Sequence, residues 1–399
     1  MTSLGAALRT LAAALAVALA LAALHPDEPA LHRDTATGSP IASSGVRLDL
    51  GPGPDLSGFS RVQGPRPFAL PADHGPHFQY QTEWWYLTGN LVSAEGQRFG
   101  FQLTVFRRGL SPGPPPPGAG LATNQVYFAH LAVTDVAAGR HRAAERFERG
   151  ADGLAGASAE PFRVWLEDWR LEDGGDAGCW RLSAADSATG LLVDLRLQPR
   201  KPLAAHGDRG VSAKSDEPGN ASYYVGYTRI AASGRVGLGE RQRSASGEAW
   251  FDHEWSTSAL GTGDVGWDWF SLQLGDGREL MYYRIRRADG SSEAVSAGTL
   301  VERDGRARRL AREEVRIEAL RRWKSPATGL SYPAGWRVEV PSAGLLLRVE
   351  PWLEDQEMRT SFVYWEGAVR VRSEAPDHPA DGQGYVELTG YGRSMEGVL

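Results

Sequence analysis

The sequence predicts an all-β protein made of two antiparallel β-sheet domains in tandem, and three observations carry this prediction. Helical periodicity is nearly absent from the 399 residues, and the best helical candidate, 306–320, has a poor pattern. Short runs of alternating apolar and polar residues, separated by Gly, Pro and Asp, dominate instead, which is typical of an antiparallel barrel or sandwich. A tryptophan-containing hairpin pattern also occurs twice, far apart in the chain.

The alternating runs can be assigned to individual strands. In 99–105, Phe99, Phe101, Leu103 and Val105 fall on one face, while Gln102 and Thr104 fall on the other. The same period of two appears in 191–198, where leucines and Val193 alternate with polar residues. Further strands are predicted at 223–230, 248–255, 267–274, 279–286, 336–340, 345–349, 364–371 and 384–390.

The repeated hairpin indicates a duplication. Residues 85–91 lead through a turn at Gly96 to an aromatic strand that ends in Arg107-Arg108. Residues 269–274 lead through Asp276-Gly277 to Tyr282-Tyr283 and a second basic end. Two such hairpins fit two similar domains, for which we expect the bounds 68–247 and 248–399. The alternative to a duplication is that any two β-hairpins look this similar by chance.

The N-terminal residues predict export. An unbroken Ala/Leu/Val run covers Leu11 to Leu24, which is short for a spanning helix and suits the apolar region of a signal peptide. We therefore expect a signal peptide or N-terminal anchor at 1–25, a Pro/Gly/Ser-rich flexible linker at 26–67, and a periplasmic or secreted protein. The single cysteine, Cys179, does not follow the run, so attachment as a bacterial lipoprotein is not expected.

Composition and motif content narrow the function classes. The net charge is −6 and the basic residues are scattered, so the chain lacks the footprint of a nucleic-acid-binding protein. Phosphate loops, dinucleotide fingerprints and nucleophile elbows are missing, as is a convincing metal-ligand spacing, so neither a cofactor nor a metal is predicted. The 13 tryptophans indicate either large cores or an aromatic-lined cavity.

The segment 250–255 contains the densest cluster of polar and aromatic residues. Alternation along a strand places Trp250, Asp252 and Glu254 on one face, and His253 and Trp255 on the other. The two carboxylates could form a pair whose repulsion raises one pKa and creates a proton donor. The acids and the imidazole would then not serve one site unless the strand bulges. The alternative is a barrel strand with a buried histidine held by a carboxylate.

A second cluster lies in 79–86, where Glu83 precedes Trp84 and Trp85. A buried glutamate beside indole rings is expected to have a raised pKa through desolvation. The alternative is a strand that closes one end of a barrel with tryptophan.

Two further positions are candidates for ligand contact. In 267–269 the two residues Trp267 and Trp269 share a face, while Asp268 falls among apolar residues and needs a partner, for which Arg284 on the return strand is a candidate. His130 shares a face with apolar residues, where a histidine is usually a core residue with its hydrogen bonds satisfied.

These motifs resemble the AttH/CrtC family, which includes carotenoid 1,2-hydratases (hydroxyneurosporene synthases). The resemblance covers about 71–391, and its most specific parts are EWWYLTGNL at 83–91 and FDHEW at 251–255. It extends through further segments at 77–82, 100–107, 129–132, 222–229, 247–250, 267–274, 323–326 and 364–367.

The resemblance implies two tandem lipocalin-like antiparallel β-barrel domains and two function classes. AttH-like members look like accessory proteins of ABC-type transport systems, whereas the hydratases add water to an isoprenoid double bond. The hydratase His-x-Trp feature matches His253 and Trp255. A Tyr-x-Asp proton-donor pair is also expected, but the comparable place reads Tyr282-Tyr283-Arg284, without the acid.

Three functional hypotheses follow. The first is an exported lipocalin-like protein that binds an apolar lipid or isoprenoid and cooperates with ABC transporter components. The second is a cofactor-independent hydratase in which Asp252 or Glu254 protonates an alkene, Trp255 and Trp267 stabilise the cation, and His253 directs water. The third is a structural spacer without a ligand. The predicted cavity-lining tryptophans are Trp84, Trp250, Trp255, Trp267 and Trp269.

Overall fold

The computed structural model describes residues 56–151, 153–176, 178–257, 260–261, 263–375 and 379–395. The expected signal segment at 1–25, and the expected linker up to residue 55, lie outside the described residues. Among the residues that are described, no helix is long and apolar enough to cross a membrane.

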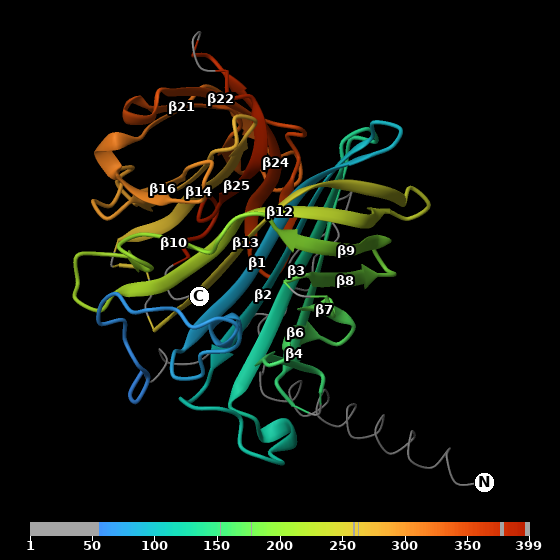
Figure 1. Ribbon diagram of the computed structural model, residues 1–399, viewed down its shortest axis with the longest axis vertical. Coiled ribbons are helices and arrows are strands. Elements are labelled where there is room, and N and C mark those ends of the chain that lie inside the picture. Colours follow the sequence, from blue (N-terminus) through green and yellow to red (C-terminus); the bar gives the residue numbers. More distant parts are fainter. Residues whose placement is uncertain are drawn as a thin grey trace, which may run out of the picture. The chain divides into compact units, whose positions relative to one another are not determined.

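The first sheet is antiparallel and has the order β4-β3-β2-β1-β13-β12-β9-β8-β7-β6-β5, with the short strands β10 and β11 beside β12. Figure 1 shows β1, β2 and β3 running side by side through its middle. Its strands are β1 (Thr82–Ser93), β2 (Arg98–Gly109), β3 (Gln125–Asp135), β4 (Arg140–Arg149), β5 (Ala155–Ala159), β6 (Phe162–Leu166), β7 (Trp169–Asp173), β8 (Trp180–Asp186), β9 (Leu191–Pro199), β10 (Ala204–Ala205), β11 (Val211–Ala213), β12 (Ala221–Leu238) and β13 (Arg243–Ser256).

The second sheet is also antiparallel and has the order β17-β16-β15-β14-β25-β24-β22-β21-β18, with β23 beside β24. Its strands are β14 (Asp264–Leu274), β15 (Glu279–Arg287), β16 (Ala297–Val301), β17 (Ala307–Ala311), β18 (Arg316–Ala319), β21 (Trp336–Val340), β22 (Leu345–Pro351), β23 (Glu357–Arg359), β24 (Val363–Ser373) and β25 (Gly382–Leu388). A separate hairpin joins β19 (Arg322–Lys324) to β20 (Ser331–Pro333), and short 3-10 helices cover Ala72–His74, Gly120–Ala122, Arg312–Glu314 and Pro341–Ala343.

The two sheets have matching strand orders. In the first, β1 lies between β2 and the last strand β13, and β2 continues to β3 and β4. In the second, β14 lies between β15 and the last strand β25, and β15 continues to β16 and β17. The two repeated hairpins therefore occupy equivalent places, as a duplication would require. The fold class is confirmed: the chain is nearly all-β, with one sheet closed almost into a barrel and the other forming a half-barrel.

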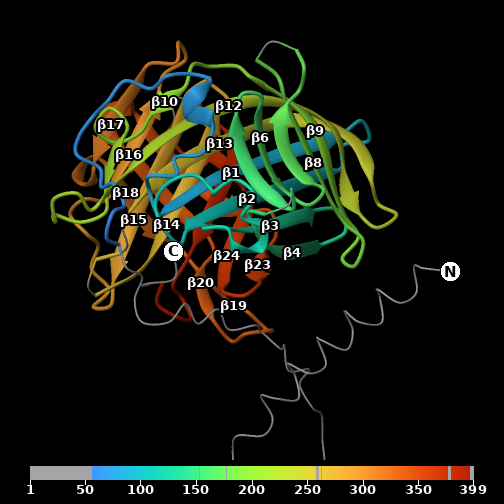
Figure 2. The ribbon, with the colours of Figure 1, turned by 90° about the horizontal axis from the view of Figure 1, so that it is seen from below.

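Each sheet encloses an apolar core of its own. The first sheet bends so that β6, β8 and β9 lie across from β2 and β3 (Figure 2), and their inward side chains form one cluster. The second sheet curls around a core that includes Phe270, Leu272, Trp336 and Trp365. Because side chains alternate along a strand, β1, β13, β14 and β25 each present one face to a core and the other to the opposite sheet.

The sheets meet along these second faces. Tyr86, Trp250 and Trp269 form part of a third apolar cluster between them. Contact is tight at Gly100, where an added Cβ would lie 2.6 Å from the Cβ of Ala368, so glycine is needed at this crossing.

Two boundary predictions differ from the structure. The expected domain boundary at 247/248 falls inside β13, and the change of sheet occurs instead between Ser256 and Asp264. The segment 306–320, whose helical pattern is poor, forms β17, a single 3-10 turn and β18, and most of its side chains are exposed. The expected linker does not extend to residue 67, since Phe59 and Val62 are already buried.

Candidate functional site

A cavity of about 130 Å³ lies between the two sheets, outside both apolar cores. Its wall is formed by residues from β1, β2, β12, β13, β14, β15, β24 and β25 and by neighbouring loops. Trp84, Trp267 and Phe362 are half-buried and lie at its rim, whereas Trp269 and Tyr224 are buried in its wall. The lining residues are Thr82, Trp84, Tyr86, Thr104, Phe106, Lys214, Tyr224, Asp252, Glu254, Ser256, Leu260, Trp267, Trp269, Tyr283, Ile285, Phe362, Tyr364, Glu387 and Met395.

Two acids reach this cavity from the first sheet. The Oδ2 atom of Asp252 accepts a 2.6 Å hydrogen bond from the Tyr224 hydroxyl, and its Oδ1 accepts one of 2.8 Å from the Trp250 indole. Glu254 accepts a hydrogen bond from Ser222 and forms an ion pair with Lys214. Both carboxylates are thus fixed by donors, and the strand alternation that placed them on one face is confirmed.

Two acids from the second sheet, which were absent from the predicted site, are the residues best suited to donate a proton. Glu387 on β25 lines the cavity, and Glu366 lies opposite it in the register of β24 and β25. Burial raises the pKa of Glu387 to about 7, helped by the negative charges of Glu254 and Asp252 and opposed by the hydrogen bond from the Trp267 indole. Glu387 therefore carries a proton for a large part of the time at neutral pH.

Glu366 is held protonated even more strongly. Burial and the charge of Glu387 raise its pKa well above the usual carboxyl range, although a 2.6 Å hydrogen bond from Tyr86 opposes the shift. Its Oε2 atom is buried and has no hydrogen-bond partner among the described residues. A neutral carboxylic acid at this position avoids a buried and unpaired charge.

The raised pKa of Glu387 makes stability depend on pH. The folded state holds this proton up to about pH 7, whereas the unfolded chain releases it near 4.5, so the free energy of unfolding should fall as pH rises between these values. A Glu387→Gln variant should lack this fall. The free energy of unfolding of the variant, relative to that of wild type, should therefore rise by on the order of 3 kcal/mol between pH 4 and pH 8. Urea unfolding at each pH measures this difference.

The matched control is Glu318→Gln on the exposed strand β18, which should track wild type at every pH. A difference between Glu387→Gln and wild type that stays constant with pH would contradict the assignment of a raised pKa to Glu387.

Only three of the five predicted cavity tryptophans reach the cavity. Trp84, Trp267 and Trp269 line the cavity. Trp250 lies behind Asp252, to which it donates its indole hydrogen bond. Trp255 is fully buried on the opposite face of β13, against a different apolar cluster, and so does not reach the cavity.

His130 lies beside the cavity without lining it. Its Nδ1 atom is 2.8 Å from the hydroxyl of Tyr364, which does line the cavity, and its Nε2 atom is 2.9 Å from Glu145. The histidine is completely buried, and its contact with Tyr364 connects the first sheet to the second. It is thus a histidine with satisfied hydrogen bonds that positions a cavity tyrosine.

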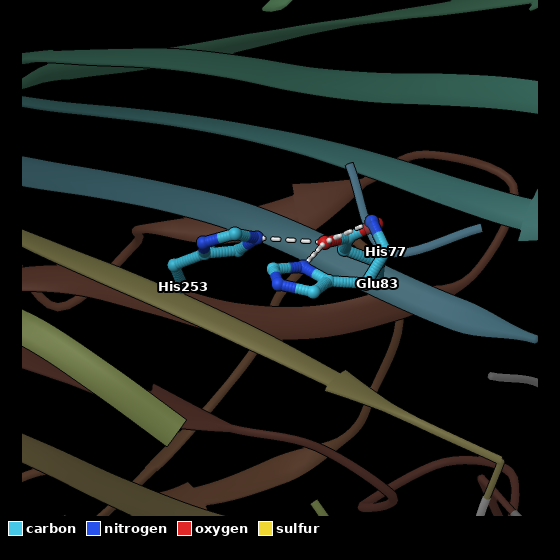
Figure 3. A group of neighbouring side chains, drawn as sticks. All are labelled: His77, Glu83 and His253. Atoms are coloured by element: carbon cyan, nitrogen blue, oxygen red, sulfur yellow. Dashed lines mark hydrogen bonds and ion pairs between the residues drawn. The ribbon is translucent and has the colours of Figure 1, made fainter. Parts of the chain in front are cut away.

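The remaining candidates from the first sheet point to its inner side. Figure 3 shows Glu83, His77 and His253 gathered together, and none of the three lines the cavity. Glu83 Oε1 lies 2.8 Å from His77 Nδ1 and 2.8 Å from His253 Nε2, and its Oε2 accepts a 2.8 Å hydrogen bond from the Arg107 guanidinium. Trp85 lies on the same side and donates its indole hydrogen bond to the backbone oxygen of His74.

The expectation of a raised pKa for Glu83 is wrong in sign. Burial alone would raise it, but the Arg107 charge and hydrogen bonds from His253 and His77 outweigh burial, and the pKa lies well below the usual range. Burial lowers the pKa of His253, only partly offset by Glu83. Burial also acts to lower the pKa of His77, but its hydrogen bonds to Asp73 and Glu83 raise it overall.

Asp268 belongs to neither group. It is completely buried and accepts hydrogen bonds from Arg284, the partner expected from the hairpin, from Arg286 at 2.9 Å and from Tyr391 at 2.9 Å. Because these donors satisfy both of its oxygen atoms, Asp268 has a structural role and does not contact the cavity.

The sequence did contain a signal for the missed acids. Val386 and Leu388 face the core of the second sheet, so alternation puts Glu387 on the other face of the same strand. Glu366 likewise lies between the core residue Trp365 and Gly367. A glutamate in the middle of an otherwise apolar strand requires a partner or a proton, and this criterion would have identified both residues.

Two tandem antiparallel sheets of this order, with a cavity between them, define a two-domain lipocalin-like protein. The chain belongs to the AttH-like family, whose pattern matches residues 61–391. The fold is shared with the crystal structure of an AttH-type protein from Nitrosomonas europaea, which has a TM-score of 0.73 and 32% sequence identity. That match covers 84% of this chain and 100% of the other.

A more distant similarity extends to kievitone hydratase from Nectria haematococca. The TM-score is 0.63 at 12% identity, and the match covers 87% of this chain and 99% of that one. At this identity the similarity shows a shared fold. Among proteins with curated functions, no match to the chain was found.

Proposed function

We propose that the protein binds a small apolar molecule, or one end of a longer one, in the cavity between the sheets. The observation that carries this proposal is an aromatic wall beside the buried carboxyl group of Glu387, which is neutral for a large part of the time at neutral pH. Trp84, Trp267 and Trp269 supply apolar surface, and the raised pKa of Glu387 reduces the negative charge that this residue adds to the cavity wall.

The size of the cavity restricts the ligand. An apolar cavity of roughly 150 Å³ holds one benzene molecule, so about 130 Å³ accommodates one ring or the end of a prenyl chain. A long isoprenoid would have to leave most of its length outside, across the half-buried rim.

Titration of the intrinsic tryptophan fluorescence with linear terpenes, such as myrcene and geraniol, tests the proposal. Three tryptophans line the cavity, so we expect a saturable change in emission. Ser256→Phe should abolish the response by filling the cavity, whereas Ser246→Phe, at an exposed position on the same strand, should retain it. A flat response across apolar ligands of this size, or an unchanged response in Ser256→Phe, would exclude the site.

A second candidate function is favoured by the raised pKa of Glu387. A neutral carboxylic acid can protonate an alkene carbon, aromatic faces can stabilise the resulting carbocation, and water can then add to it. The added water loses a proton to the Glu387 carboxylate, so the acid is regenerated and the net reaction is hydration. We propose this hydro-lyase activity as the chemistry of a bound isoprenoid.

This version of the hydratase hypothesis assigns different residues from those expected. His253 and Trp255 face away from the cavity, so they cannot direct water or stabilise a cation there. Glu387 takes the role of proton donor, because Arg284 stands where the Tyr-x-Asp pair of the hydratases would have its acid. Export to the periplasm and cooperation with an ABC-type transport system remain part of the proposal, because the ligand class suits transfer between a membrane and a carrier.

A further inference from the structure

The two histidines beside Glu83 have an unusual arrangement of hydrogen-bond partners. His77 Nδ1 lies 2.8 Å from Glu83 Oε1, and His77 Nε2 lies 3.0 Å from Asp73 Oδ1. Both neighbours are carboxylate oxygens, which accept hydrogen bonds. The Arg66 guanidinium is farther from Nε2, at 3.4 Å, and binds Asp73 at 2.6 Å. Hydrogen bonds to both of these carboxylate oxygens would require a proton on each ring nitrogen of His77.

Both ring nitrogens of His253 also face hydrogen-bond acceptors. Its Nδ1 atom lies 3.1 Å from the backbone oxygen of Asp73, which can only accept, and its Nε2 atom lies 2.8 Å from Glu83 Oε1. Glu83 already accepts hydrogen bonds from Arg107 and from the backbone N–H of His77. His253 would therefore also need two ring protons.

Two imidazolium rings at this place are unfavourable. Their centres are 5.5 Å apart, the His253 side chain is completely buried and that of His77 is 13% exposed. Two like charges at such a separation, out of water, repel strongly. One divalent cation could replace the two protons that face Glu83, one on His77 Nδ1 and one on His253 Nε2, and the net charge would stay the same. The two imidazoles and Glu83 would then all bind this one ion.

We propose that His77 Nδ1, His253 Nε2 and Glu83 Oε1 form a binding site for one divalent transition-metal ion such as Zn²⁺. These three atoms lie within 4.8 Å of one another. Metal–ligand bonds of about 2.0–2.2 Å separate the ligand atoms of a tetrahedral site by about 3.3–3.6 Å, so each 2.8 Å contact with Glu83 Oε1 would lengthen by roughly 0.5–0.8 Å. Two imidazoles and one carboxylate, with a fourth position left for water, are an established ligand set for Zn²⁺.

The surroundings match those of metal-binding histidines. In such sites the second ring nitrogen donates to a carboxylate or to a backbone oxygen, which fixes the ring. Here His77 Nε2 faces the Asp73 carboxylate and His253 Nδ1 faces the Asp73 backbone oxygen. The partly exposed side of His77 gives a route of entry. The site is on the opposite face of β13 from the cavity, so it is independent of the proposed ligand binding.

Titration of the full chain with Co²⁺ tests this inference. After dialysis against a chelator, we expect one equivalent of Co²⁺ to bind, with the visible absorption of a four-coordinate ion, and to be displaced by Zn²⁺. X-ray absorption of the Zn²⁺-loaded protein should show two imidazole ligands. Absence of metal uptake by folded wild-type protein, or a coordination shell without imidazole, would overturn the proposal.

The matched variants are His77→Gln and His74→Gln. His77→Gln should lower the affinity for Co²⁺ by at least 100-fold. His74→Gln removes a neighbouring imidazole whose Nε2 contacts the Tyr227 hydroxyl instead, and it should keep wild-type affinity. Equal affinity in His77→Gln and wild type would place the bound ion elsewhere and refute the assignment. Should His77→Gln fail to fold, the X-ray absorption measurement on wild type decides.

Discussion

Replacing Arg107 with methionine should lower the free energy of unfolding by about 3–5 kcal/mol. Arg107 and Glu83 are both completely buried, and the guanidinium Nε donates a 2.8 Å hydrogen bond to Glu83 Oε2. The same guanidinium also donates to Gln125 and to the backbone oxygens of His77 and Tyr80. Methionine fills a similar volume but leaves a buried carboxylate without its main counter-charge.

Two further variants separate this effect from a general cost of mutation. Arg181→Met removes an exposed ion pair with Asp194 and should cost at most about 1 kcal/mol. The double variant Glu83→Gln/Arg107→Met removes the uncompensated charge and should be more stable than Arg107→Met alone. Urea unfolding in the presence of a chelator measures all of them without a contribution from bound metal. A loss below 1 kcal/mol in Arg107→Met would contradict the prediction.

Strand alternation was enough to predict which face each residue of the 250–255 cluster occupies. The rule needs only the sequence, and it separated Asp252 and Glu254 from His253 and Trp255 as the structure does. It could not show that the acidic face meets a second sheet rather than the inside of a barrel. That depends on how the two sheets pack, which no local pattern encodes.

The wrong sign for the pKa of Glu83 had a cause that the sequence could have shown. The turn at Gly96 sets the register of the first hairpin, and that register places Arg107 directly opposite Glu83. Burial beside the tryptophans predicts a raised pKa, whereas the charge of Arg107 on the opposing strand lowers it. In contrast, the approach of His77 and His253 to Glu83 joins a loop to a strand more than 170 residues later, and sequence spacing therefore indicated no metal site.

The acids of the second sheet could be found from alternation, but their pKa values could not. Glu387 has a raised pKa because it is buried and because Asp252 and Glu254 face it from the first sheet. This electrostatic cluster draws members from β13 and β25, which are far apart in the sequence. Its existence is a property of the packed pair of sheets.

Glu387→Gln should reduce hydration of an acyclic isoprenoid by about 10²–10⁴-fold, the usual contribution of a general acid. Glutamine keeps the shape of the side chain and can accept the Trp267 hydrogen bond, but it cannot transfer a proton to carbon. Mass detection of an added water after incubation with the isoprenoid measures the rate. The matched control is Glu350→Gln, which alters a partly exposed ion pair with Arg370 and should leave the rate unchanged.

The pH dependence gives this prediction a second and independent readout. Since the acid must be protonated, the wild-type rate should decline as pH rises through about 7, the pKa of Glu387. If Asp252 or Glu254 were the donor instead, Glu387→Gln would retain most of the rate, because both remain fixed by Tyr224, Ser222 and Lys214. Equal rates in Glu387→Gln and wild type would therefore show that Asp252 or Glu254 of the first sheet is the proton donor. Absence of product from folded wild type would contradict the hydratase proposal and leave ligand binding as the function of the cavity.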